Sequence, residues 1–187
     1  MTQPNWFLAL PLPPPAAWHE AAASAPTELK RLDRLDLHLT LAFLGPCGQD
    51  RAEEAWRALA ALRQPAIRIR AGRWRGLGAA HQPSAYGLTL AEGQPTLGAL
   101  LGNWAPLALE AAGRPPDRRP PLPHVTLLRP RRREARQMRE PMERWMAGAP
   151  LPGRDAELGE LALYTWAEER SRRLFRLHLR RPLERQS

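Results

Sequence analysis

Hydrophobic and polar positions alternate along residues 35–44, which read LDLHLTLAFL. The odd positions carry leucines and a phenylalanine, whereas the even positions carry Asp36, His38 and Thr40. A repeat of two residues is typical of a strand that turns one face toward the core. The pattern therefore predicts a half-buried strand, which the Gly45-Pro46 pair ends.

The same reading along the chain predicts a mixture of strands and helices. Further strands are expected at residues 5–10, 66–75, 85–91, 122–128, 157–165 and 173–180. Helices are expected at residues 14–32, 50–63, 95–112 and 129–146, with interruptions at Pro26, Pro106 and Pro141. Helices between antiparallel-type strands favour an α+β fold. A chain of 187 residues suits one domain, or one domain built of two lobes.

A short motif occurs twice on the predicted strands. His38-Leu39-Thr40-Leu41 is repeated, with one change, as His124-Val125-Thr126-Leu127 almost half a chain later. Residues i and i+2 of a strand share a face, so each copy places an imidazole beside a hydroxyl. If the two strands face each other, they form a cleft with two imidazoles and two hydroxyls.

Such a constellation suits phosphodiester chemistry. One neutral imidazole can accept a proton from water, while the other, as imidazolium, protonates the departing ribose oxygen. The threonine hydroxyls can donate to the phosphate oxygens, on which charge develops in the transition state. The alternative is that both motifs belong to solvated strand faces without a catalytic role.

Both motifs resemble the signatures of the two-histidine (2H) phosphoesterases. The LigT-like group, named for 2′-5′ RNA ligase and RNA 2′,3′-cyclic phosphodiesterase, is the most similar. DLHLTLAFLG resembles its first signature and PLPHVTLLR its second, while WFLALPLP and ELALYTW resemble an early and a late strand. The resemblance covers nearly the whole chain, with Pro11 standing where the family often has an acidic residue.

This resemblance implies a fold and an activity. It implies one domain over residues 1–187 with two lobes, each carrying one motif (residues 38–40 and 124–126). Antiparallel sheets related by a pseudo-twofold axis, with helices outside, would surround a central cleft. The implied activity is hydrolysis of terminal 2′,3′-cyclic phosphates of RNA to 2′-phosphates, with no metal or other cofactor. The catalytic residues would be His38, Thr40, His124 and Thr126.

The family's usual scheme makes His124 the general base and His38 the general acid. Two neighbours give this assignment weak local support. Arg129, close to His124 in sequence, would lower the pKa of that imidazole and favour its neutral form. Asp36 shares the predicted face of His38 and would favour the imidazolium there, although residues i and i+2 of a strand are not in direct contact.

Several residues are candidates for substrate binding. Arg129 would contact phosphate if the strand ends or bulges before it, because an unbroken strand would point it away from His124. Phe7 would stack on a base or pack in the core, and Trp74 and Tyr164 are weaker stacking candidates. A further group of arginines would hold the RNA backbone or form a solvated helix face. This group comprises Arg131, Arg132, Arg133, Arg136 and Arg139.

Composition adds limits on partners and location. The net charge of +9 favours a polyanionic partner, here RNA or a nucleotide with a cyclic phosphate end. Cys47 is the single cysteine, which rules out an internal disulfide and fits a cytoplasmic setting. Two histidines without a facing carboxylate fall short of a zinc site. No apolar run suits a membrane span. The sequence carries no signal for oligomeric state, and a monomer is the default expectation.

Two alternatives to hydrolysis remain open. The same site would act as a 2′-5′ RNA ligase if a ribose hydroxyl replaced water as the attacking group. A noncatalytic nucleotide- or RNA-binding module is the other alternative, although binding alone would not require two proton-transfer groups.

Overall fold

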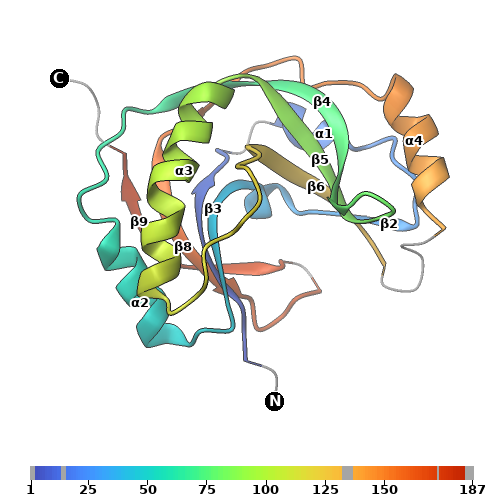
Figure 1. The fold of residues 1–187 in the computed structure, drawn as a ribbon. Coiled ribbons are helices and arrows are strands. Elements are labelled where there is room, and N and C mark those ends of the chain that lie inside the picture. The colour runs from blue at the N-terminus through green and yellow to red at the C-terminus, as the bar shows by residue number, and fades with distance from the viewer. Residues whose placement is uncertain (1–2, 14–15, 132–136, 172, 184–187) are drawn as a thin grey trace.

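A computed structural model of the chain describes residues 3–13, 16–131, 137–171 and 173–183. It is an α+β structure in which antiparallel strands form one curled sheet (Figure 1). The strands are β1 (Trp6–Pro11), β2 (Leu29–Arg31), β3 (His38–Gly45), β4 (Ile67–Ala79), β5 (Gln82–Glu92), β6 (His124–Pro130), β7 (Ala156–Leu158), β8 (Glu160–Trp166) and β9 (Phe175–Pro182). The expected α+β fold built on antiparallel strands is therefore confirmed.

The sheet has two halves that follow the same plan. Its order is β7-β4-β5-β6-β3-β1-β8-β9, with β2 pairing the last residues of β6, beyond the point where β3 pairs it. In one half β3 is flanked by β1 and then β8; in the other, β6 is flanked by β5 and then β4. The halves meet where β3 and β6 pair, at Leu39 and Val125. The two strands predicted to carry the motifs are therefore neighbours at the centre of the sheet.

Helices cover the sheet from outside (Figure 1). They are α1 (Ala16–Glu20), α2 (Gln49–Ala58), α3 (Gln94–Ala111) and α4 (Arg139–Gly148), with a 3-10 turn, η1 (Arg34–Asp36). α2 and α3 pack on each other, and α3 also contacts β3, β4 and β5. The core between the helices and the sheet is rich in leucine, and Leu39, Leu88 and Leu97 have no exposed surface.

The four expected helices differ from the structure in their bounds or their continuity, and the one expected at residues 50–63 ends at Ala58. Within the predicted helix 14–32 only Ala16–Glu20 is α-helical, and Leu29–Arg31 forms β2 instead. Pairing with the edge of β6 supplies main-chain hydrogen bonds that no local pattern reveals. Pro106 does not interrupt α3, which runs on to Ala111.

The predicted helix 129–146 is also shorter than expected. β6 extends to Pro130, and α4 begins only at Arg139. Pro141 therefore lies in the first turn of α4, where a helix needs no amide hydrogen, and it does not break the helix. Arg132, Arg133 and Arg136 lie outside the described residues.

Candidate active site

The pairing of β3 with β6 brings the two motifs side by side. Leu39 and Val125 are register partners, and both are fully buried. Continuing this antiparallel register by one residue each way sets one motif's histidine opposite the other motif's threonine. All four of these side chains are half-buried, on the side of the sheet away from Leu39 and Val125. We call this side, carrying His38, Thr40, His124 and Thr126, the histidine face.

Both motifs are followed by the same β-bulge. In β3 the extra residue is Leu41, because Leu8 pairs with Ala42 and Ala9 with Thr40. In β6 the pairing of Tyr86 with Leu128 and of Gly87 with Thr126 leaves Leu127 as the extra residue. A bulge places two consecutive residues on the same side of a strand and reverses the alternation after them.

The bulges turn Phe43 and Arg129 onto the histidine face. Each is the first exposed residue after its motif, and Phe43 is 56% exposed. The condition under which Arg129 was expected to approach the site is therefore met. Phe43 was not singled out from the sequence. Its position five residues after His38, which matches that of Arg129 after His124, is the signal that reveals it.

Each imidazole is fixed by its own main chain. Nδ1 of His38 donates to the carbonyl oxygen of Asp36 at 2.7 Å, and Nδ1 of His124 donates to that of Leu122 at 2.6 Å. A carbonyl oxygen only accepts, so Nδ1 carries the hydrogen on both rings. Nε2 is then left to exchange protons with a substrate on both histidines.

Aromatic rings surround His38. Phe7 stacks on it with 4.8 Å between ring centroids, and Tyr164 stacks on Phe7 at 5.2 Å. The Phe175 ring meets the imidazole edge-on at 5.4 Å. Phe7 is only 3% exposed, so its ring packs in the core as a support for His38 and offers almost no surface to a base. Trp74 is buried too, and its indole nitrogen donates to the carbonyl oxygen of Pro150.

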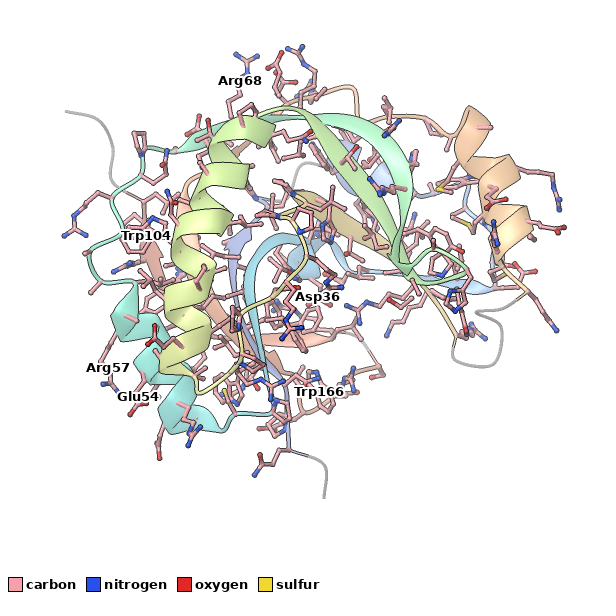
Figure 2. All side chains as sticks on the ribbon, viewed as in Figure 1. Asp36, Glu54, Arg57, Arg68, Trp104 and Trp166 are labelled. Carbon is pink, nitrogen blue, oxygen red and sulfur yellow. The ribbon has the colours of Figure 1, made fainter. Side chains whose placement is uncertain are left out.

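Asp36 acts on the His38 ring through its main chain, while its carboxylate holds the neighbouring strand β9. It belongs to η1 and is 2% exposed, near the middle of the molecule (Figure 2). Its carboxylate accepts hydrogen bonds from the backbone of Leu174 and Phe175 and forms an ion pair with Arg173. The carboxylate thus anchors the start of β9, which places Phe175 against His38. The expectation that its charge favours the His38 imidazolium is not supported, since only its carbonyl oxygen acts on that ring.

The pKa values of both catalytic candidates lie below that of a free histidine. Burial lowers the pKa of His38 to about 4, and the positive charge of Arg129 adds to this effect. Burial also lowers the pKa of His124, with a further contribution from the charge of Arg75. Near neutral pH both imidazoles of the free protein are therefore neutral.

This result corrects the expectation about Arg129. The residue was expected to lower the pKa of His124, which precedes it on β6, but its charge acts on His38 of the other strand. The reason is the bulge in β6 together with the antiparallel pairing of β6 with β3. Arg129 pairs in register with Lys30 of β2, and its guanidinium carbon lies 6.0 Å from the centre of the Phe175 ring. It therefore lies on the His38 side of the face.

Comparison with known proteins agrees with this architecture. No protein-family model and no curated protein matches the chain. Among solved structures, a protein described as a phosphoesterase is 23% identical with a TM-score of 0.72, over 97% of this chain and 98% of its own. Escherichia coli LigT complexed with 3′-AMP is 24% identical with a TM-score of 0.71, over 97% of this chain and 99% of its own.

The chain has the LigT fold. A third structure, TT0787 of Thermus thermophilus, is similar at 21% identity and a TM-score of 0.67, over 98% of this chain and 100% of its own. The fold that the two motifs implied is therefore confirmed. At these identities the LigT likeness concerns the arrangement of the chain, whereas the chemistry is argued from the residues on the histidine face.

Two further features of the described residues bear on the site. They contain no group of three or more histidine, cysteine or carboxylate side chains arranged to hold a metal ion. Among their helices, none combines the length and the hydropathy of a membrane span.

Proposed function

We propose that the chain is an RNA 2′,3′-cyclic phosphodiesterase that opens terminal cyclic phosphates without a metal ion. The observation that carries this proposal is the antiparallel pairing of β3 with β6, which sets two histidine–threonine pairs on one face. In both imidazoles Nε2 is the nitrogen left for a substrate, because Nδ1 is held by a carbonyl oxygen in each. Binding alone would not require two proton-transfer groups in matching positions.

The proposed reaction removes a proton from the attacking water and delivers a proton to the departing oxygen on the opposite side of the phosphorus. One imidazole accepts a proton from water as the water oxygen bonds to phosphorus. The bond from phosphorus to the 3′ oxygen breaks, and the other imidazole, protonated, gives its proton to that oxygen. The product has a 2′-phosphate and a free 3′-hydroxyl. Within the described residues neither threonine hydroxyl bonds to another protein group, so Thr40 and Thr126 are available to the nonbridging oxygens.

The low pKa values fit this scheme because the bound substrate itself stabilises the protonated form of the acid. A neutral imidazole is ready to act as a base, whereas the acid must be protonated when the substrate is bound. The negative charge of a cyclic phosphate beside both rings raises their pKa values and stabilises one imidazolium. We keep His124 as base and His38 as acid on the resemblance alone, because Arg129 lies beside the other histidine.

Two further side chains complete the proposed substrate site. The Arg129 guanidinium matches the geometry of phosphate oxygens and donates two parallel hydrogen bonds. The exposed ring of Phe43 provides a stacking surface for the nucleobase. The solved structures of E. coli LigT with 3′-AMP, with ATP and with phosphate support a nucleotide-sized, phosphate-bearing ligand for this fold.

The test uses an oligoribonucleotide with a 2′,3′-cyclic phosphate end, a 5′-hydroxyl RNA acceptor and EDTA. We expect a product with a 2′-phosphate, which a 2′-specific phosphatase removes, and little joined RNA. His38→Ala and His124→Ala should abolish most turnover, whereas the matched control His81→Ala, in the exposed turn between β4 and β5, should not. Joined RNA as the main product would show a ligase. Activity lost with EDTA and restored by one divalent metal would refute the metal-free reaction.

A further inference from the structure

A row of residues crosses three strands beside the second motif. Arg75 of β4 is the register partner of Gly87 of β5, and Gly87 is the partner of Thr126 of β6. Register partners in antiparallel strands project from the same side of a sheet. Arg75 therefore lies on the histidine face. Trp74, its neighbour on β4, is buried on the opposite side of the sheet with Leu88.

Gly87 lets the backbones of β5 and β6 approach each other closely beside the motif. A Cβ atom at this position would lie 2.2 Å from the carbonyl oxygen of Val125, so any larger residue would force the strands apart. Neighbouring strands lie about 4.8 Å apart, which places the backbone of Arg75 roughly 10 Å from that of Thr126. The arginine side chain is long enough to cover much of this distance. Its charge acts on His124 and lowers the pKa of that imidazole.

The equivalent row in the other half of the sheet carries no charge. There Ala162 of β8 pairs with Ala9 of β1, which pairs with Thr40 of β3. Arg75 thus occupies the position in its half of the sheet that Ala162 occupies in the other. The half that carries His124 therefore has a positive charge for which the other half has no equivalent. This asymmetry indicates that the substrate extends in one direction from the histidines.

Among the described residues, no acidic side chain neutralises the charge of Arg75. Arg68 and Arg70, on the same strand, bind the carboxylate of Asp155. In the described part of the chain, by contrast, no carboxylate forms an ion pair with the exposed Arg75. An arginine that faces a proton-transfer site without an acidic partner is suited to an anionic ligand.

We propose that Arg75 binds a second phosphate of the substrate, the phosphodiester that precedes the terminal nucleotide. This proposal rests on the proposed function. The cyclic phosphate carries a single negative charge and is held by the threonines and Arg129, which leaves Arg75 for the next phosphate along the chain. A substrate with a preceding nucleotide then gains one more contact on the His124 side of the face than a mononucleotide does. The preferred substrate is an RNA end and not a free mononucleotide.

The test compares a dinucleotide with a mononucleotide, both ending in a 2′,3′-cyclic phosphate. In Arg75→Ala, kcat/KM on the dinucleotide should fall about tenfold more than on the mononucleotide, the loss expected for one charged contact. The dependence of log kcat/KM on log salt should also become shallower by about 0.7 for the dinucleotide. Arg57→Ala is the matched control, since it removes an exposed arginine from the outer edge of α2 (Figure 2). It should leave the ratio between the two substrates unchanged.

Equal losses on both substrates would overturn the proposal, because they would show that Arg75 acts only through His124 or through folding. No loss on either would overturn it as well. The same comparison by equilibrium binding uses a dinucleotide and a mononucleotide that end in a 2′-phosphate. The two proposals are tested by different measurements. Absent turnover by the wild type refutes the proposed function, whereas binding of these non-reacting ligands does not depend on turnover. The ratio of dissociation constants still decides the role of Arg75.

Discussion

Phe43 in β3 and Arg129 in β6 occupy equivalent positions, each turned onto the histidine face by a bulge that directly follows its motif. The two halves of the sheet thus present different chemistry at the same place. One offers an exposed ring and the other a guanidinium group. An aromatic platform and a phosphate-binding arginine are the two contacts that a nucleotide needs beside the atoms that react.

Phe43→Ala should weaken binding without unfolding the protein. The ring is 56% exposed, so its removal creates no internal cavity. If the ring stacks on the nucleobase, KM for adenosine 2′,3′-cyclic phosphate should rise about tenfold, within the range for one stacked base. KM for a ribose cyclic phosphate that lacks a base should change far less. Leu107→Ala is the control for exposure, because Leu107 of α3 is 46% exposed. Equal KM changes with and without the base would contradict stacking.

Arg129→Ala should have two separable effects. Loss of the phosphate contact should lower kcat/KM by about 10- to 100-fold, as expected for a hydrogen bond to a charged group. Arg129→Lys should recover only part of it, since an ammonium group lacks the planar pair of donors. Removal of the charge should also raise the pKa of His38 above about 4, which an NMR titration of the ring protons measures. A pKa that does not move would show that Arg129 does not face His38. Arg176→Ala, an exposed arginine of β9, is the control.

The pH dependence should differ between the free and the bound enzyme. The profile of kcat/KM reports the free enzyme, where both histidine pKa values are lowered and one ring must still be protonated. Its bell should therefore be centred below about pH 6.5, the ordinary pKa of histidine. The profile of kcat reports the complex, in which the bound anion raises both pKa values, so its bell should be centred at higher pH. A kcat/KM bell centred at neutral or alkaline pH would contradict the lowered pKa values.

The central strands of the fold, and the face that the two motifs share, could be predicted because their signals are local. The alternation of LDLHLTLAFL and the repeat of histidine and threonine fix which residues share a face, whatever the rest of the chain does. The side chains after the motifs could not be assigned, because a bulge depends on how β3 pairs with β1 and β6 with β5. The same holds for β2 and for Arg75, whose places follow from strand pairing far along the chain.

The assignment of acid and base is decided by leaving-group chemistry. A general acid matters when the departing oxygen is a poor leaving group, such as the ribose 3′ oxygen. An aryl phosphodiester that releases nitrophenolate needs little protonation. With His38 as the acid, His38→Ala should lose about 10²- to 10⁴-fold on the cyclic phosphate and much less on the aryl ester. His124→Ala should lose activity on both substrates, because water must still be activated.

This experiment is needed because the surroundings of the two histidines, although different, do not assign their roles. Burial lowers the pKa of both, and each has one arginine whose charge acts on it, Arg129 for His38 and Arg75 for His124. If the aryl ester rescues His124→Ala instead, the two roles are exchanged. In that case His38, with the pKa of about 4, is the base. If neither variant loses activity on the cyclic phosphate, the two imidazoles are not the proton-transfer groups, and the proposed function fails with them.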